Sequence, residues 1–194
     1  KRIFLACEIP QEIKDEIKKI CQQLKVSGFQ LRLTSKEKLH ITLAFLPQVN
    51  SQQLTEISKM TKSICTNLPT FSIFLNNLDA FPNLKLPRVV FVSLSGETGT
   101  LANLATKIQH ELEKLDFEFD HSRFTPHITI ARIKSYVGKV ERRKLGETIQ
   151  RWGKLRALKI PVDDVTIFES TPTSTGHIHT LLEKISLKNA DLRY

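Results

Sequence analysis

The segment LHITLAFLP, residues 39–47, places a histidine and a threonine two positions apart inside a short apolar run. Successive side chains of an extended strand point to opposite faces, so His40, Thr42 and Ala44 are expected to share one face. The apolar residues between them, through Phe45, then form the other face. The pattern predicts a strand that buries its apolar side and points an imidazole and a hydroxyl the other way, with the small alanine leaving room beside them.

A near copy of this segment, PHITIARIK, occupies residues 126–134. His127, Thr129 and Ala131 are expected on one face of this strand, and the isoleucines on the other. Threonine and isoleucine are common in strands, and a single histidine there is more often structural than catalytic. Two copies separated by nearly half the chain instead favour a duplicated lobe, in which the two polar faces meet across one cleft.

Hydrophobic periodicity predicts the remaining elements. Strands are expected at residues 2–9, 29–34, 38–46, 70–81, 88–95, 126–133, 158–170 and 177–187. Helices are expected at 11–24, 50–68 and 98–115, and residues 138–152 form either a helix or an irregular segment. The second helix begins with a cap at Asn50 or Ser51.

Pairs of strands separate these helices, which predicts an α+β fold class with antiparallel sheets. No low-complexity linker divides the chain, so residues 1–194 are expected to form a single domain of two intimately packed lobes. The repeated strand predicts that a pseudo-twofold axis relates these lobes around a central cleft.

Composition narrows the class of protein. The chain has 29 Lys and Arg against 20 Asp and Glu, a net charge of +9, which favours a polyanionic partner or a phosphate-bearing substrate. Cys7, Cys21 and Cys65 are odd in number and widely spaced, so we expect buried thiols in a cytoplasmic protein rather than disulfides or a zinc site. No apolar run approaches the roughly 18 residues of a membrane span, and the start KRIFLACEIP is expected to be a strand rather than a signal peptide.

Two imidazoles that face each other can cleave a phosphodiester by concerted proton transfer. The neutral imidazole accepts a proton from the attacking water or hydroxyl, and the protonated one gives a proton to the departing oxygen. Thr42 and Thr129 would supply hydroxyls to the non-bridging phosphate oxygens. This scheme requires neither a metal nor a cofactor.

Four segments of the chain resemble those of a known family. They are RIFLACEIP, FQLRLTSKEKLHITLAFLPQV, LDAFPNLKLPRVVFVSL and FTPHITIARI. In these segments the chain resembles the two-histidine (2H) phosphoesterases, and specifically the branch named RNA 2′,3′-cyclic phosphodiesterase or 2′-5′ RNA ligase (LigT-like). One motif alone would be weak evidence, but two at this spacing in matching surroundings are strong, and the resemblance covers nearly the whole chain. It implies a bilobal α+β fold with a V-shaped cleft.

The resemblance also implies roles for individual residues. His40 and Thr42 would form one half-site, and His127 and Thr129 the other. His40 would donate a proton to the leaving oxygen and His127 would accept one from water, although the pseudo-symmetry leaves this division open on the sequence alone. The reaction would hydrolyse a 2′,3′-cyclic phosphate at an RNA or nucleotide end to a 2′-phosphomonoester, and its reverse would join such an end to a 5′-hydroxyl without ATP. We expect a monomer that binds such an end and no membrane.

Three further residues are candidates for substrate binding. Arg88 begins a strand and Arg132 follows the second motif, and a guanidinium suits phosphate. Strict alternation places Arg132 on the face opposite His127, unless the strand bulges there. Phe91 lies where the family often has tryptophan, and it would offer a smaller ring for stacking on a base.

Three other histidines are weaker candidates. His177 and His179 share a strand face at a spacing that a metal site could use, but no third ligand is near, so we expect them to face solvent. His121, in the turn before the second motif, is expected to be a loop residue, and an approach to the cleft stays open.

Two other functions fit the sequence. One is a cyclic phosphodiesterase that acts on small nucleotides such as ADP-ribose derivatives. The other is a noncatalytic module that binds RNA or a nucleotide in a basic cleft. The duplicated histidine motif argues against such a module, because binding alone needs no opposed proton carriers. Competition between substrates of different length would separate the two enzymes.

Overall fold

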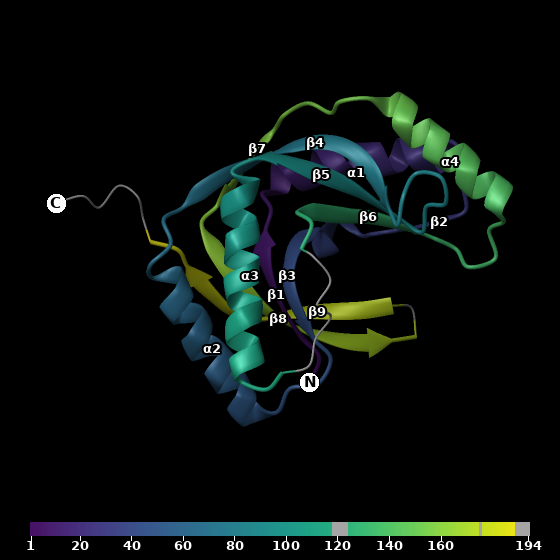
Figure 1. Ribbon diagram of the computed structural model, residues 1–194. Coiled ribbons are helices and arrows are strands. Elements are labelled where there is room, and N and C mark those ends of the chain that lie inside the picture. Colours follow the sequence, from purple (N-terminus) through teal and green to yellow (C-terminus); the bar gives the residue numbers. More distant parts are fainter. Residues whose placement is uncertain (118–123, 175, 189–194) are drawn as a thin grey trace.

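The computed structural model describes residues 1–117, 124–174 and 176–188 (Figure 1). Within these ranges, single strands and runs of strands separate the helices along the chain, and the strands form two antiparallel sheets. The elements are β1 (Ile3–Glu8), α1 (Gln11–Val26), β2 (Leu31–Leu33), the 3₁₀ turn η1 (Lys36–Lys38), β3 (His40–Leu46), α2 (Ser51–Cys65), β4 (Phe71–Phe81), β5 (Val89–Gly96), α3 (Thr98–Lys114), β6 (His127–Ile133), α4 (Lys139–Trp152), β7 (Lys159–Val162), β8 (Asp164–Thr173) and β9 (Gly176–Ser186). The predicted α+β class is confirmed, and the segment at 138–152 is a helix.

The two sheets repeat one arrangement around the two His-x-Thr strands. The first sheet has the order β3-β1-β8-β9, and the second has the order β2-β6-β5-β4-β7. Strands β3, β1 and β8 therefore occupy the same places as β6, β5 and β4. Strand β4 comes from the first half of the chain but lies in the second sheet, and β8 does the reverse. This exchange of strands ties the two halves together, and it shows the predicted pseudo-twofold relation of two lobes.

The helices pack on the sheets through faces that the sequence predicts. The predicted apolar face of α1 is buried at Ile13, Ile17, Ile20 and Leu24. Helix α1 contacts β6, α4 contacts β4, and α2 packs against α3 and the β8–β9 hairpin. Helix α2 begins with a capping box, in which the Asn50 side chain accepts a hydrogen bond from the Gln53 amide and the Gln53 side chain accepts one from the Asn50 amide.

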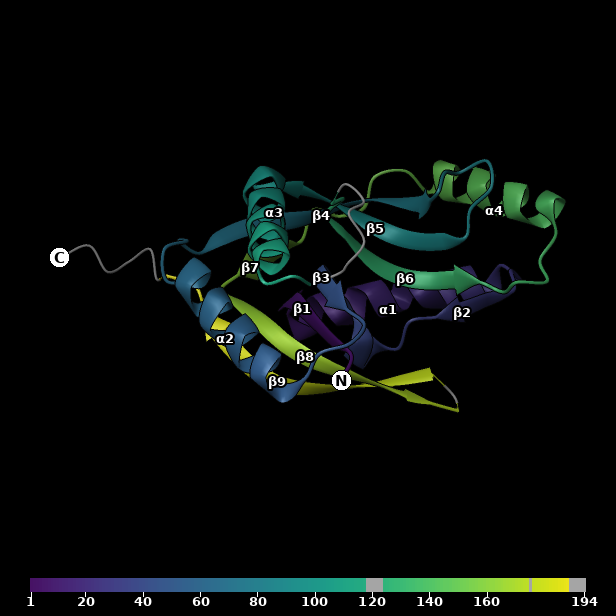
Figure 2. The ribbon, with the colours of Figure 1, turned by 60° about the horizontal axis from the view of Figure 1, so that its bottom comes forward.

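One predicted strand, residues 158–170, is in fact two. Strand β7 lies at the edge of the second sheet, whereas β8 continues inside the first, so the chain crosses between sheets at Asp163. Pro161 fits an edge strand because proline has no amide hydrogen for a second neighbour. Figures 1 and 2 both show the β8–β9 hairpin extending on the same side of the molecule as β6.

The three cysteines are free and buried, as predicted. None of the helices in the described ranges is both long and apolar enough to cross a membrane.

The contact between α4 and the loop after β4 leads to a prediction about stability. A β-carbon on Gly146 of α4 would overlap the Leu84 carbonyl oxygen, whereas one on Gly99 of α3 would meet nothing within 4 Å. Alanine normally stabilises a helix relative to glycine by about 1 kcal/mol. We expect Gly146→Ala to lower the free energy of unfolding by about 1–3 kcal/mol. The new methyl group would force α4 away from the Leu84 backbone, which cannot rotate aside as a side chain can.

The matched control is Gly99→Ala, which should leave the free energy of unfolding unchanged or raise it by up to about 1 kcal/mol. Urea denaturation of both variants checks the prediction. If Gly146→Ala proved as stable as Gly99→Ala, the close packing of α4 on Leu84 would be wrong.

Candidate active site

His40 begins β3 and is held by the 3₁₀ turn before it and by Thr42 of the same strand. Its Nδ1–H donates a hydrogen bond to the Lys38 carbonyl oxygen at 2.7 Å, and Thr42 Oγ1 lies 3.0 Å from Nε2. A carbonyl oxygen can only accept, so Nδ1 carries the proton in the neutral ring and Nε2 has a free lone pair, toward which the threonine hydroxyl donates. Nε2 can therefore accept a proton or, once protonated, donate one.

His127 begins β6 and is held in the same way. Its Nδ1–H donates to the Thr125 carbonyl oxygen at 2.6 Å, again two residues earlier in the chain. Strands β3 and β6 contact each other, and the charge of His127 contributes to lowering the pKa of His40. The structure thus places the two predicted imidazoles on strands that contact each other, with Nε2 as the nitrogen of each ring that is not bonded to a carbonyl.

A β-bulge interrupts both His-x-Thr strands at the same place, and it corrects the predicted alternation. Leu43 is an extra residue opposite β1, and Ile130 is an extra residue opposite β5. The residue after each bulge is buried, Ala44 at 6% exposure and Ala131 at 0%, so neither alanine lies on the histidine face. Phe45, expected in the core, is 46% exposed instead.

The second bulge also changes the expected place of Arg132. After one extra residue the alternation reverses, so Arg132 lies on the exposed face that carries His127 rather than on the opposite one. Its positive charge contributes to lowering the pKa of His127. Arg32 on β2 is its direct cross-strand neighbour. Arg132 is therefore placed to meet an anionic substrate on the histidine face.

Each imidazole rests on a pair of stacked phenylalanines. Phe4 stacks on His40 at 4.8 Å between ring centroids and on Phe168 at 5.0 Å. On the second sheet, Phe91 and Phe81 stack at 4.2 Å, and both meet the His127 ring edge to face, at 5.3 and 5.0 Å.

This packing corrects the expected role of Phe91. Its side chain is only 3% exposed, so the ring is closed to a base and supports His127 instead. The sequence offered no sign of this role, because an aromatic residue on a central strand can either face a substrate or be buried against a neighbouring side chain.

The electrostatics of the protein alone favour the neutral form of both histidines. Burial, followed by the charge of His179, lowers the pKa of His40 to about 4, against which the hydrogen bond to the Lys38 carbonyl acts. Burial also lowers the pKa of His127, and the charge of Arg132 adds to it, while the hydrogen bond to the Thr125 carbonyl raises it. A bound phosphate would oppose these shifts, because its negative charge stabilises an imidazolium.

His179 lies in the site, contrary to the expectation that it faces solvent. Its ring centroid is 5.6 Å from that of His40, at an interplanar angle of 69°, and it is half-buried. His177 is exposed, as expected. The spacing of the two residues gave no warning, because the first sheet curves and so brings β9 toward the face of β3. His121 lies outside the described residues.

Arg88 lies at the rim, away from the histidines. It lines a cavity of about 510 Å³ together with Lys139 and Arg142. The Arg142 guanidinium donates to the Val137 and Pro87 carbonyl oxygens, so it holds the loop around this cavity. His127 pairs with Ser93, in the second half of β5. Arg88 precedes the start of β5, so the paired part of β5 separates Arg88 from His127.

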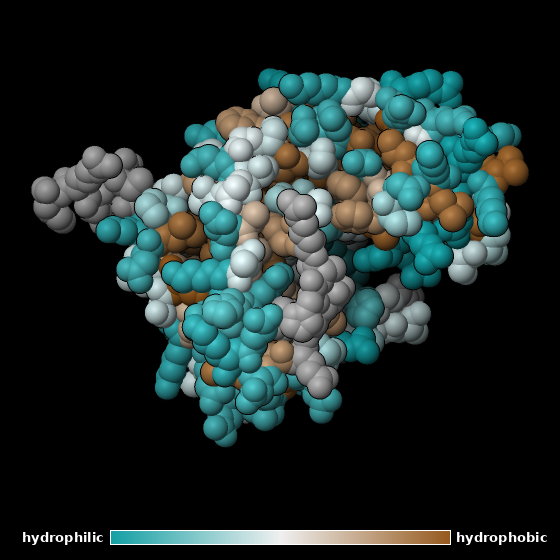
Figure 3. All heavy atoms as spheres, in the orientation of Figure 1, coloured by the Kyte–Doolittle hydropathy of each residue, from teal (hydrophilic) through white to brown (hydrophobic). Residues whose placement is uncertain are grey.

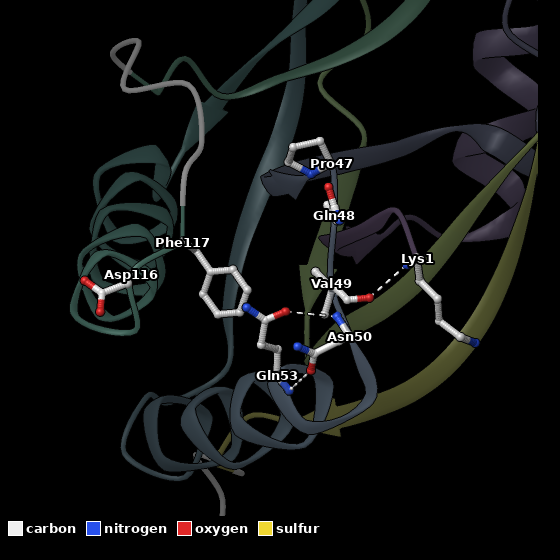
Figure 4. Close-up of a pocket in the computed structure, with 8 residues that line it drawn as sticks. All are labelled: Lys1, Pro47, Gln48, Val49, Asn50, Gln53, Asp116 and Phe117. Atoms are coloured by element: carbon white, nitrogen blue, oxygen red, sulfur yellow. Dashed lines mark hydrogen bonds between the residues drawn. The ribbon is translucent and has the colours of Figure 1, made fainter.

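Another cavity, of about 630 Å³, lies between the first residue, the β3–α2 loop and the end of α3 (Figure 4). The amino group of Lys1 donates to the Val49 carbonyl oxygen at 2.8 Å there. None of the predicted site residues lines it. The space-filling view shows the surface hollowed instead between the part that carries β6 and the β8–β9 hairpin (Figure 3). Within the described ranges, no group of three His, Cys, Asp or Glu side chains is arranged to hold a metal ion.

Comparison with known proteins places this arrangement in a family. The chain is 32% identical over its whole length to a Thermotoga maritima protein named RNA 2′,3′-cyclic phosphodiesterase, 99% of which is covered. A solved protein of Thermus thermophilus shares the fold with a TM-score of 0.81 at 24% identity, over 98% of this chain and 100% of that one. Escherichia coli LigT, solved in complex with 3′-AMP, gives a TM-score of 0.73 at 22% identity, over 96% and 98%.

The family profile described as LigT like phosphoesterase matches the chain twice, over residues 8–91 and 92–179, and each match contains one His-x-Thr strand. The twofold repeat therefore appears at three levels: in the sequence motif, in the order of strands in the sheets and in the matches to the family profile. The chain therefore belongs to the family of LigT-like phosphoesterases.

Proposed function

We propose that this protein hydrolyses RNA 2′,3′-cyclic phosphate ends to 2′-phosphomonoesters by acid and base catalysis with His40 and His127. One observation carries the proposal: each imidazole donates Nδ1–H to the carbonyl two residues earlier in the chain, which leaves Nε2 as the nitrogen for proton transfer, on two strands that contact each other. The name of the Thermotoga maritima relative supports RNA with a cyclic end as the substrate.

The chemistry follows from these positions. His127 takes a proton from water, whose oxygen attacks the phosphorus atom. The bond from phosphorus to O3′ breaks, and His40 gives its proton to that oxygen, which leaves the phosphate on O2′. Thr42 and Thr129 donate hydrogen bonds to the non-bridging oxygens as their charge rises. Each proton transfer contributes about 10²–10⁴-fold to the rate. Protons are conserved, because the one lost by His40 equals the one gained by His127.

The division of roles rests on the family resemblance, and the electrostatics set a condition on it. Burial, and after it the charge of His179, lowers the pKa of His40 to about 4 in the protein alone, so this imidazole resists protonation. His40 can act as the acid only if the bound phosphate raises its pKa. The scheme needs one proton shared between two imidazoles, and no metal ion.

Ligation uses the same groups in the same roles as hydrolysis, with a 5′-hydroxyl in place of water. His127 would accept the proton of that hydroxyl as its oxygen attacks phosphorus, and His40 would donate a proton to O3′ as the bond from phosphorus to O3′ breaks. We propose on this basis that the site can also join a 2′-5′ linkage at a cyclic end without ATP.

Substrate competition tests the proposal. A short RNA with a labelled 2′,3′-cyclic end is incubated with the protein, and the opened product is separated by electrophoresis. We expect turnover, with the RNA outcompeting an ADP-ribose cyclic phosphate at equal concentration. Preference for the ADP-ribose derivative would assign the protein to small nucleotides. Salt-dependent binding with no turnover of either compound would assign it to the noncatalytic binders.

A further inference from the structure

The pseudo-symmetry of the site breaks at one residue. On the first sheet His40, Phe4, Phe168 and His179 form a continuous set of rings, in which His179 meets Phe4 at 4.7 Å and His40 at 5.6 Å. The second sheet has His127, Phe91 and Phe81 in the equivalent places. Among the described residues no fourth ring joins this second set, because β7 pairs only with the start of β4, and Phe81 lies at the other end.

His179 belongs to a small group of basic side chains that includes Lys38. The Lys38 ammonium lies 3.9 Å from the position of a β-carbon on Gly176, the first residue of β9. Burial is the main cause that lowers the pKa of His179, and the charges of Lys38 and His177 follow. The group therefore extends from His40 along the β8–β9 hairpin.

These basic side chains have no negative partner in the described part of the chain. Neither the Lys38 ammonium nor the His179 ring has a hydrogen bond or an ion pair with a described residue. Burial and the nearby Lys38 charge disfavour the protonated form of His179, and an anion bound between these side chains would favour it. In the proposed mechanism the reacting phosphate lies between His40 and His127. His179 and Lys38 are therefore available to bind a second phosphate of the substrate.

The identity of the second phosphate follows from the chemistry of the substrate. In an RNA that ends in a 2′,3′-cyclic phosphate, the neighbouring phosphate is the one on the 5′ oxygen of the terminal nucleotide. We propose that His179 and Lys38 bind this 5′-phosphate, and that the site therefore prefers RNA ends to nucleoside cyclic phosphates. The inference rests on the proposed function, since it assigns a further part of the same substrate.

Kinetics with two small substrates test this subsite. They are adenosine 2′,3′-cyclic phosphate and the same compound with a 5′-phosphate. We expect kcat/KM of the protein to favour the 5′-phosphorylated substrate by about tenfold or more, as charge-assisted hydrogen bonds would give. His179→Ala and Lys38→Ala should each reduce this preference several-fold, through KM rather than kcat. His110→Ala, which removes an exposed imidazole of α3, is the control and should keep the preference.

A binding measurement separates this inference from the proposed function. Calorimetry compares adenosine 3′,5′-bisphosphate with 3′-AMP, and it needs no turnover. A preference for the bisphosphate that both variants lose would support the subsite even if the protein hydrolysed neither cyclic phosphate, in which case only the proposed function would fail.

Three results would overturn the inference. The first is that the unmodified protein shows no preference for a 5′-phosphate. The second is that His179→Ala loses the same factor of affinity for 3′-AMP as for the bisphosphate. The third is that His179→Ala has a lower kcat and a shifted pH profile on both substrates. The last result would mean that His179 acts on His40 instead.

Discussion

Replacing His40 or His127 with alanine is expected to lower kcat on an RNA cyclic phosphate by about 10²–10⁴-fold in each case. Each substitution removes one of the two proton transfers, and the remaining imidazole cannot perform both. The measurement is single-turnover hydrolysis at saturating protein. His110→Ala is the control, because His110 lies exposed on α3, where it pairs with Glu113, and it should keep full activity.

A glutamine series guards against loss of structure. Alanine at position 40 leaves the Lys38 carbonyl oxygen without its donor, whereas the amide of glutamine can still donate to it. His40→Gln and His127→Gln should therefore unfold at nearly the temperature of the unmodified protein, yet lose activity as the alanine variants do. Full activity in any variant of either histidine would contradict the proposed pair.

A second substrate can decide which imidazole is the acid. A nitrophenyl phosphodiester has a leaving group that departs without a proton, so it needs a base but no acid. His40→Ala should lose far less activity on this ester than on the cyclic phosphate, with a difference of at least about tenfold between the two substrates, since one proton transfer is worth that much or more. His127→Ala should lose a similar factor on both.

The opposite pattern would exchange the two roles. It would also agree with the electrostatics of the protein alone, where burial and His179 hold the pKa of His40 at about 4. A pH profile by itself cannot decide between the assignments. Both need one proton on the pair, and the two protonation states give profiles of the same shape.

The fold could largely be predicted from local patterns, and the parts that could not be predicted depend on contacts between distant segments. The apolar face of α1 and the cap at Asn50 follow from the spacing and type of nearby residues. The crossing from β7 to β8 does not follow from nearby residues, because it depends on which sheet has a free edge for β7 to join.

Within the candidate site, the repeat alone predicts the two histidines and two threonines, which lie on strands that contact each other. The bulges at Leu43 and Ile130 could not be predicted, since an extra residue opposite a neighbouring strand leaves no mark on the strand's own sequence. They decide the burial of the two alanines and the face of Arg132. The prediction for His179 was wrong because its place beside His40 depends on how the first sheet curves across β1 and β8.

Product analysis in EDTA is the sharpest test of the two-histidine mechanism. RNA with a 2′,3′-cyclic end is incubated with the protein and excess chelator, and ³¹P NMR identifies the phosphate that remains on the terminal ribose. We expect undiminished hydrolysis and a 2′-phosphate as the sole product, because the bond to O3′ breaks with a proton from an imidazole. Loss of activity in EDTA, restored by a divalent metal, or a 3′-phosphate product, would contradict the mechanism.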